Sequence, residues 1–286
     1  MPLDVSLDHV GFIVQDLNAG ARIWERLGFQ LSPVSPQMGL NDAGEFEPWA
    51  TANRCAVFET GYLELIGVHR PGLKNPWTAQ LARFEGAHIA AFRVACADET
   101  YASMGDAARW FAPPVQRRRD APYFADGTWG QREMRFRNIF SHPDTVAEAR
   151  YIIIEHQTPD VLWQPALLNH PNGARAFRHM CFVAPIADAC HARLNALGRS
   201  DGAGTFVCPN GGTVECIGPD AFRARYAGEG INADAAIGSC TIEVSDLDQT
   251  RACLSANGVP FHDATGCIWL SPAHAGGTIL EFSVQE

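Results

Sequence analysis

The sequence predicts an α+β fold in which one strand–helix–strands unit occurs four times. The first observation is a matching pair of segments near the two ends of the chain. The second is a single glutamate in an apolar strand near the end of every unit. The third is composition: 47% hydrophobic and 19% charged residues are the ordinary balance of a globular protein with a sizeable core.

The matching segments at the chain ends are the clearest copies of the unit. Residues 7–14 alternate as a strand, Asp16 then begins a helical stretch, and Gly28 follows its end. Asp246 and Gly258 have the same separation behind another short strand. Glycine takes positive φ without penalty, so it is a natural residue after a helix. These two segments predict equivalent strand–helix pairs.

Two weaker copies lie between them. They begin at strands 87–94 and 177–184, and the first continues into a helix predicted near residues 101–111. The apolar strands that close the four units carry Glu64, Glu155, Glu215 and Glu281. Burying a carboxylate costs several kcal/mol unless a partner compensates it. Four carboxylates at one place in a repeat therefore indicate shared ancestry or metal ligation.

The copies group into two predicted domains, residues 1–160 and residues 170–286. The segment 157–174 is rich in Pro and polar residues and is interpreted as the linker. The second unit contains an irregular stretch, 113–131, which we expect to form a loop. Its basic run, Arg117-Arg118-Arg119, is interpreted as a solvated loop, with an anion contact as the alternative.

Charge and cysteine content exclude several classes. A formal net charge of -10 disfavours nucleic acid as a partner. No apolar stretch is long enough to cross a bilayer, and the first residues lack the features of a signal peptide. Nine cysteines with no Cys-x-x-Cys pair indicate reduced thiols. We expect a cytoplasmic protein with a small-molecule substrate, and a homodimer is left open.

Three groups of residues carry a family resemblance. They are Leu7-Asp8-His9-Val10-Gly11, the run 51–54 with the strand 61–66, and the junction 156–174. They resemble the vicinal oxygen chelate superfamily and, more closely, the bacterial glyoxalase-like domain family. The resemblance implies that the units are βαβββ modules, which pair into two half-barrel domains. It covers most of residues 5–175.

The resemblance also implies a metal site in the N-terminal module pair. In this superfamily each module offers one ligand from its first strand and one from its last. The matching positions are His9, Glu64, His88 and Glu155. Two imidazoles and two carboxylates suit Zn, Ni, Co, Mn or Fe(II) with positions open for substrate oxygens. If the last strand is shifted by one residue, His156 replaces Glu155 as the inward group.

Such a site implies a metal-dependent lyase or isomerase. The ion would chelate two neighbouring substrate oxygens and stabilise an enediolate or enolate. The catalytic residues are then Glu155 and Glu64, with Glu155 preferred as the general base for a proton α to a carbonyl.

Two alternatives stay open. The C-terminal pair offers His179, Glu215 and Glu281, with Ser239 at the fourth position. Extradiol dioxygenases resemble this arrangement but need a second histidine there. The other alternative is a metal-free protein of the same fold that sequesters a small aromatic or cationic ligand. Its candidate walls are Trp49, Trp129 and Trp163.

Overall fold

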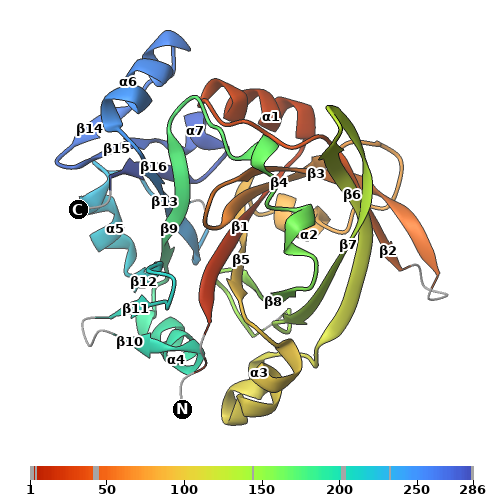
Figure 1. Cartoon of the computed structure of the whole chain (residues 1–286). Helices are drawn as coiled ribbons and strands as arrows, with labels where there is room; N and C mark the ends of the chain where they lie inside the picture. Colours follow the sequence, from red (N-terminus) through yellow and green to blue (C-terminus); the bar gives the residue numbers. More distant parts are fainter. Residues whose placement is uncertain are drawn as a thin grey trace.

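The computed structural model describes residue 3 and residues 5–40, 45–143, 145–200, 204–231 and 233–284. Four βαβββ modules follow one another along the chain and form two eight-stranded sheets (Figure 1). The predicted α+β fold of four such modules is confirmed. Within the described ranges, no helix has the length and apolar character needed to cross a membrane.

The first sheet contains modules one and two. Module one consists of β1 (Ser6–Val14), α1 (Leu17–Arg26), β2 (Ser35–Leu40), β3 (Phe46–Val57) and β4 (Tyr62–Val68). The short α2 (Thr78–Leu81) leads into module two. Module two consists of β5 (Gly86–Arg93), α3 (Ala97–Ser103), η1 (Gly105–Trp110), β6 (Val115–Ala125), β7 (Thr128–Phe140) and β8 (Arg150–His156).

The second sheet contains modules three and four, reached through η2 (Pro159–Val161) and η3 (Pro165–Leu167). Module three consists of β9 (Ala174–Val183), α4 (Ala187–Leu197), β10 (Arg199–Ser200), β11 (Thr205–Val207) and β12 (Thr213–Ile217). After α5 (Pro219–Arg225), module four consists of β13 (Ala236–Val244), α6 (Leu247–Ala256), β14 (His262–Ala264), β15 (Cys267–Leu270), α7 (Pro272–Ala275) and β16 (Ile279–Ser283).

The strand order explains why the chemistry gathers at the middle of each sheet. The first sheet runs β2-β3-β4-β1-β5-β8-β7-β6, and the second runs β10-β11-β12-β9-β13-β16-β15-β14. The first strand of every module lies parallel to its last strand, and paired modules meet through antiparallel first strands. The first and last strands of both modules are therefore the four central strands.

The helix boundaries follow local signals in the sequence. Asp16 accepts hydrogen bonds from the backbone N–H groups of Asn18 and Ala19 at the start of α1. Asp246 accepts one such hydrogen bond, from the N–H of Asp248, at the start of α6. A carboxylate in this position satisfies N–H groups that have no partner within the helix. Gly28 has φ +85° and Gly258 has φ +62°, as expected for residues that end helices.

One face of each sheet packs into a core that both halves share. The ring of Phe29 lies 5.9 Å from that of Phe282, and Tyr151 stacks on Phe182 at 5.5 Å. These contacts join residues that are far apart in the chain, and all four are buried. The other face of each sheet lines a cavity of its own.

The segment 113–131 is not the irregular loop that the sequence predicted. It belongs to the long β6–β7 hairpin, which extends along one side of the molecule (Figure 1). Asp126 and Gly127 form its turn with φ of 51° and 76°. A two-residue turn with both φ positive matches the twist of the strands, and Asp-Gly favours it. Arg117 and Arg119 consequently lie on a strand.

Candidate active site

The first sheet encloses a cavity of about 410 Å³. This volume lies within the range typical of small-molecule pockets. Its walls are largely aromatic and aliphatic, and they include Trp49, Trp77, Phe136 and Ile152. A small set of polar side chains lies on the central strands. Apolar walls with few polar groups are the usual composition of a small-molecule site.

The polar set is organised by Asp8, which is fully buried on β1. His9 Nδ1 donates a hydrogen bond to Asp8 Oδ1 at 2.7 Å. His156 Nε2 donates to the two oxygens of the same carboxylate at 3.2 and 3.3 Å. Burial by itself raises the pKa of Asp8, but the charges and hydrogen bonds of His156 and His9 outweigh it and hold the pKa well below its ordinary value. Asp8 is therefore ionised and can only accept.

This contact fixes the chemistry of His9. Since Nδ1 carries the proton donated to Asp8, Nε2 presents its lone pair. Nε2 lies 3.9 Å from Glu64 Oε2, and both residues line the cavity. Asn53 donates a hydrogen bond to the other oxygen of Glu64. The Tyr62 ring stacks on the imidazole with centroids 4.2 Å apart, which holds the ring plane. The structure thus brings together two of the four predicted residues, His9 and Glu64.

The structure does not bring His88 and Glu155 to this pair. His88 occupies an irregularity in the β1–β5 pairing, where its ring stacks on Phe84 and Nε2 donates to the Phe84 carbonyl at 2.9 Å. Glu155 accepts a hydrogen bond from the Ala97 N–H at the start of α3. Glu155 lies on the face of β8 that is turned away from the cavity. The next residue, His156, lines the cavity. His156, rather than Glu155, is therefore the inward-facing residue of β8, as expected if the strand is shifted by one residue.

Register shows which residues replace them. Ile89 on β5 pairs with Arg150 as His9 pairs with Tyr62, and Ile152 on β8 pairs with Ala91 as Glu64 pairs with Gly11. In the second sheet the corresponding positions are Ser239, which pairs with Ile279 and is the position expected from the sequence, and Glu281, which pairs with Thr241. Module two therefore presents two apolar side chains where polar ones were expected.

The surroundings of His88 give a stability prediction. Burial lowers its pKa from 6.5 to about 4, so the folded protein holds the ring neutral while the unfolded chain protonates it. The stability that depends on the neutral ring is complete above pH 6.5 and is lost as the pH falls toward 4. His88→Gln keeps a donor for the Phe84 carbonyl but does not titrate.

We expect the wild type to lose about 2 kcal/mol more than His88→Gln between about pH 7.5 and about pH 5. Urea unfolding at both pH values measures this difference, and other titrating groups cancel between the two proteins. Parallel losses of stability would show that His88 does not titrate differently on unfolding.

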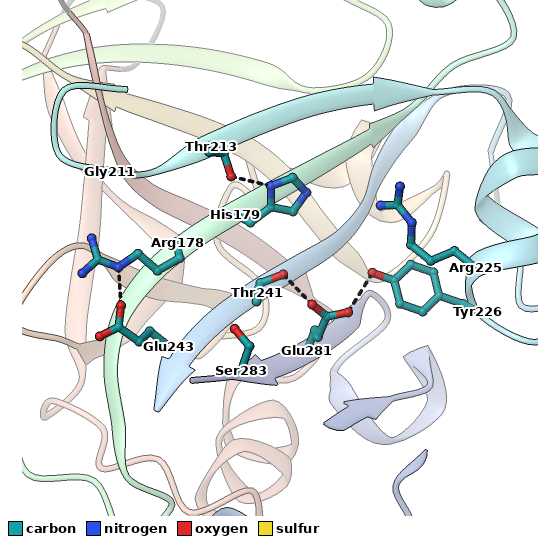
Figure 2. Close-up of a pocket in the computed structure, with 10 residues that line it drawn as sticks. All are labelled: Arg178, His179, Gly211, Thr213, Arg225, Tyr226, Thr241, Glu243, Glu281 and Ser283. Atoms are coloured by element: carbon teal, nitrogen blue, oxygen red, sulfur yellow. Dashed lines mark hydrogen bonds and ion pairs between the residues drawn. The ribbon is translucent and has the colours of Figure 1, made fainter. Parts of the chain in front are cut away.

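The second sheet lines another cavity, of about 460 Å³ (Figure 2). Its histidine lies in the same register as His9: His179 pairs with Thr213, and Cys181 with Glu215, as His9 pairs with Tyr62 and Gly11 with Glu64. The side chains facing this cavity are largely paired with one another. The labelled residues of Figure 2 include His179, Thr213, Arg225, Tyr226, Thr241 and Glu281.

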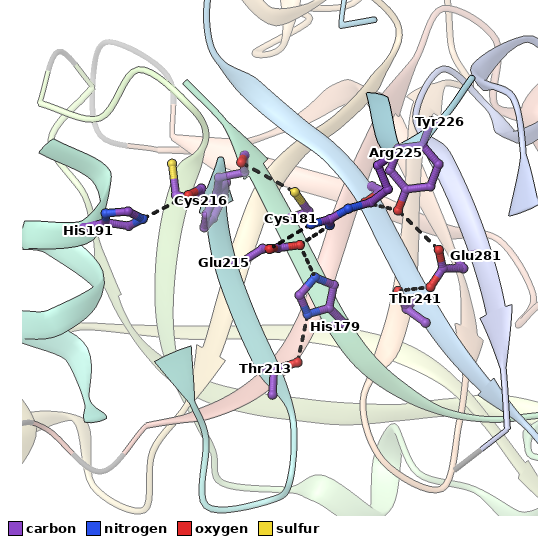
Figure 3. Close-up of polar contacts among 12 residues, drawn as sticks. His179, Cys181, His191, Thr213, Glu215, Cys216, Arg225, Tyr226, Thr241 and Glu281 are labelled. Carbon is purple, nitrogen blue, oxygen red and sulfur yellow. Dashed lines mark hydrogen bonds and ion pairs between the residues drawn. The ribbon is translucent and has the colours of Figure 1, made fainter. Parts of the chain in front are cut away.

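Two sets of polar contacts link these groups, one from Thr213 through His179 and Glu215 to Arg225 and the other from Tyr226 through Glu281 to Thr241 (Figure 3). Thr213 Oγ1 lies 2.8 Å from His179 Nδ1, and Nε2 lies 3.1 Å from Glu215. Arg225 makes a two-pronged ion pair with Glu215. Burial raises the pKa of Glu215, but the hydrogen bonds and charges of His179 and Arg225 outweigh it and leave the pKa far below its ordinary value. The charge of this carboxylate is already neutralised.

Among the residues that the structure describes, neither cavity supplies a complete donor set for a metal ion. Catalytic zinc sites generally use three protein ligands, and Fe(II) sites often use two His and one carboxylate. The first cavity offers His9 and Glu64, whereas the Nε2 of His156, which also lines it, is hydrogen-bonded to Asp8. In the second, Arg225 is ion-paired with Glu215, and Ser239 lies at the position that would need a second histidine. Within the described part of the chain, no group of three or more His, Cys, Asp or Glu is arranged to hold a metal.

The three candidate tryptophans have different environments. Trp49 lines the first cavity. Trp163 packs against Tyr62 and His156 at centroid distances of 5.9 and 4.9 Å. Trp129 lies on the β6–β7 hairpin and is 42% exposed. Only Trp49 forms part of the cavity wall that the sequence interpretation assigned to all three.

Solved structures with the same fold cover nearly all of this chain. A hypothetical protein from Staphylococcus aureus has a TM-score of 0.60 at 10% identity, with 98% of this chain and 100% of that chain covered. A mutant 4-hydroxymandelate synthase from Streptomyces coelicolor has a TM-score of 0.57 at 12% identity, covering 100% and 95%. A xylose isomerase-like TIM barrel/4-hydroxyphenylpyruvate dioxygenase fusion protein has a TM-score of 0.53 at 13% identity. The match to the fusion protein covers 99% of this chain and 49% of that chain.

At these identities the structures show the fold alone. No curated protein sequence matches the chain. The family model described as a glyoxalase-like domain matches residues 7–198, which include both modules of the first sheet and the start of the third module. That match covers more than half of the sequence, and the chain belongs to the glyoxalase-like domain family.

Proposed function

We propose that the cavity of the first sheet is the active site of a lyase or isomerase, in which His9 and Glu64 move a proton on a small substrate. The observation that carries the proposal is the sequence of contacts from Asp8 through His9 toward Glu64. A buried carboxylate fixes the imidazole tautomer, and the free nitrogen faces a second acid–base group across 3.9 Å. General acid–base catalysis by a positioned histidine requires this kind of arrangement.

Each residue has a defined part in the proposed step. His9 Nε2 takes the proton from a substrate carbon next to a carbonyl, and the ionised Asp8 stabilises the imidazolium that results. Glu64 is the second group, which exchanges a proton with the substrate at the neighbouring atom. Asn53 holds its carboxylate through the hydrogen bond to one oxygen. The base role assigned to Glu155 from the sequence passes to His9, because Glu155 faces the start of α3.

Hydrogen–deuterium exchange tests this function without knowledge of the natural substrate. Proton NMR in D₂O follows the α-protons of a panel of α-hydroxycarbonyl compounds and 2-oxo acids. We expect the wild type to catalyse exchange with at least one member of the panel. His9→Asn and Glu64→Gln should each lower that rate by about 100-fold or more, the usual contribution of a general acid or base.

The matched control is His179→Asn, which changes the histidine in the same register of the second sheet. Its exchange rate should equal that of the wild type. Loss of exchange in His179→Asn alone would move the active site to the second sheet. A wild-type protein that exchanges none of the panel would contradict the proposed proton transfer.

Metal dependence is measured in the same assay. With His9 and Glu64 as acid–base groups, we expect exchange to survive a chelator. The sequence interpretation instead made these two residues ligands of Zn, Ni, Co, Mn or Fe(II). Exchange that a chelator abolishes and one of these ions restores, together with metal loss in His9→Asn, would favour that interpretation.

A further inference from the structure

Two arginines at the cavity share one aromatic ring. Arg150, the first residue of β8, has its guanidinium carbon 4.7 Å from the ring centroid of Phe140 and 5.6 Å from that of Trp77. Arg117 on β6 lies 5.9 Å from the centroid of Phe140. All four side chains line the cavity. The rings orient the guanidinium groups by cation–π contact, and no described residue accepts a hydrogen bond from their N–H groups.

These two arginines differ from most others on the neighbouring strands; Arg119, which also lines the cavity, donates to Ser35. Arg118, Arg132, Arg135 and Arg137 each have an acidic partner, namely Glu133, Asp160, Glu133 and Asp98. Over the described ranges, no carboxylate lies within ion-pair distance of Arg117 or Arg150. Desolvation and the charge of Arg117 lower the pKa of Arg150 below its ordinary value. Two like charges are thus held together without compensation, an arrangement that an anion would stabilise.

The cavity also contains buried polar atoms without partners. Trp49 Nε1 and Asn138 Oδ1 are buried and make no hydrogen bond to the described residues. Asn138 is 5% exposed and lines the cavity between Phe136 and Phe140 on β7. Buried polar atoms are nearly always satisfied in native proteins, so an orphan in a cavity wall points to a ligand. The remaining wall is mostly apolar, so the part of the ligand that contacts it should be apolar as well.

We propose that the substrate is a small, largely apolar molecule with one anionic group, a carboxylate or a phosphate monoester, which Arg117 and Arg150 bind. Its apolar body lies between Trp49, Trp77 and Phe136, and its reacting carbon reaches His9 and Glu64. The placement of the reacting carbon rests on the proposed function, whereas the recognition of the anion does not.

Matched acid and neutral probes test the recognition by isothermal titration calorimetry. Phenylacetate is compared with phenylacetamide, and benzyl phosphate with benzyl alcohol, so that each pair differs mainly in charge. We expect at least one anion to bind about tenfold more tightly than its neutral partner. The pair that shows the difference identifies the head group as carboxylate or phosphate. Equal affinity within both pairs, or no saturable binding, would overturn the proposal.

Arg150→Gln and Arg117→Gln should each weaken binding of the anion about tenfold and leave the neutral probe unchanged. Arg135→Gln is the matched control, because its guanidinium pairs with Glu133 on the same hairpin and is absent from the cavity wall. Unchanged affinity in both Arg150→Gln and Arg117→Gln would overturn the proposal. So would an equal loss in Arg135→Gln.

The same titrations in Glu64→Gln and His9→Asn separate this inference from the proposed function. Anion binding that persists in these variants supports the arginine site whether or not the wild type exchanges protons. Proton exchange without any preference for the anion would overturn the arginine site and leave the proposed function standing.

Discussion

Replacement of Arg193 by methionine is expected to lower the free energy of unfolding by about 3–5 kcal/mol, the usual cost of leaving a buried charge unpaired. Arg193 on α4 donates two-pronged hydrogen bonds to Glu148, at 2.7 and 2.6 Å from its Nη2 to the two oxygens. The Tyr151 hydroxyl donates to the same carboxylate at 2.8 Å. The Glu148 side chain is only 1% exposed. Without Arg193 its charge stays buried with a single neutral donor.

Urea unfolding measures this loss, and two further variants show its cause. Arg193→Met combined with Glu148→Gln removes the buried charge and should recover much of the stability. Arg223→Met breaks the exposed pair with Asp220 and should cost less than about 1 kcal/mol. A loss below about 1 kcal/mol in Arg193→Met would mean that Glu148 finds water or becomes protonated in the folded state.

The repeat could be predicted because its signals are local. Asp16 and Asp246 begin helices, and Gly28 and Gly258 end them, through contacts within a few residues. The β6–β7 hairpin could also have been predicted, because its turn signal is local. Its Asp126-Gly127 turn is a strong hairpin signal, although polar and proline residues on both sides favoured a loop.

The site residues expected from the sequence come together in module one and not in module two. His9 and Glu64 lie on β1 and β4, whose mutual pairing runs without interruption, although β1 shifts register against β5 beside His9. His88 falls at a break in the β1–β5 register, and one inserted residue reverses the face that a side chain occupies. On β8 the pairing is regular, and alternation places His156 toward the cavity with Ile152 and Ile154 and turns Glu155 away from it.

The other features that the sequence did not predict depend on contacts between residues far apart in the chain. The pairing of Glu148 with Arg193 joins module two to module three and has no sequence pattern. The two arginines on Phe140 come from different strands, and their lack of acidic partners becomes visible only when the neighbours are placed. Asp8 lay within the segment that carried the resemblance, but its central role depends on His156, which is 148 residues away.

The same Asp8 gives the largest expected effect on activity. Asp8→Asn is expected to lower the rate of proton exchange by about 100-fold to 10,000-fold. Asparagine fills the same space, but it is uncharged and its amide group can donate a hydrogen bond. It therefore no longer fixes the proton on His9 Nδ1, and it no longer stabilises the imidazolium formed when Nε2 accepts the substrate proton. Substrate affinity should be unchanged, because Arg117 and Arg150 lie elsewhere in the cavity.

If Asp8 had only a structural role, Asp8→Asn would lower stability and probe affinity together with the exchange rate. Exchange rates should fall at saturating substrate, the affinity for the probe anion should hold, and urea unfolding should show that Asp8→Asn is folded. Asp16→Asn is the matched control, because asparagine also caps helices well and the residue lies outside the cavity. If Asp8→Asn exchanges protons at the wild-type rate, His9 does not need the carboxylate to act as a base. Glu64 would then be the group that removes the proton.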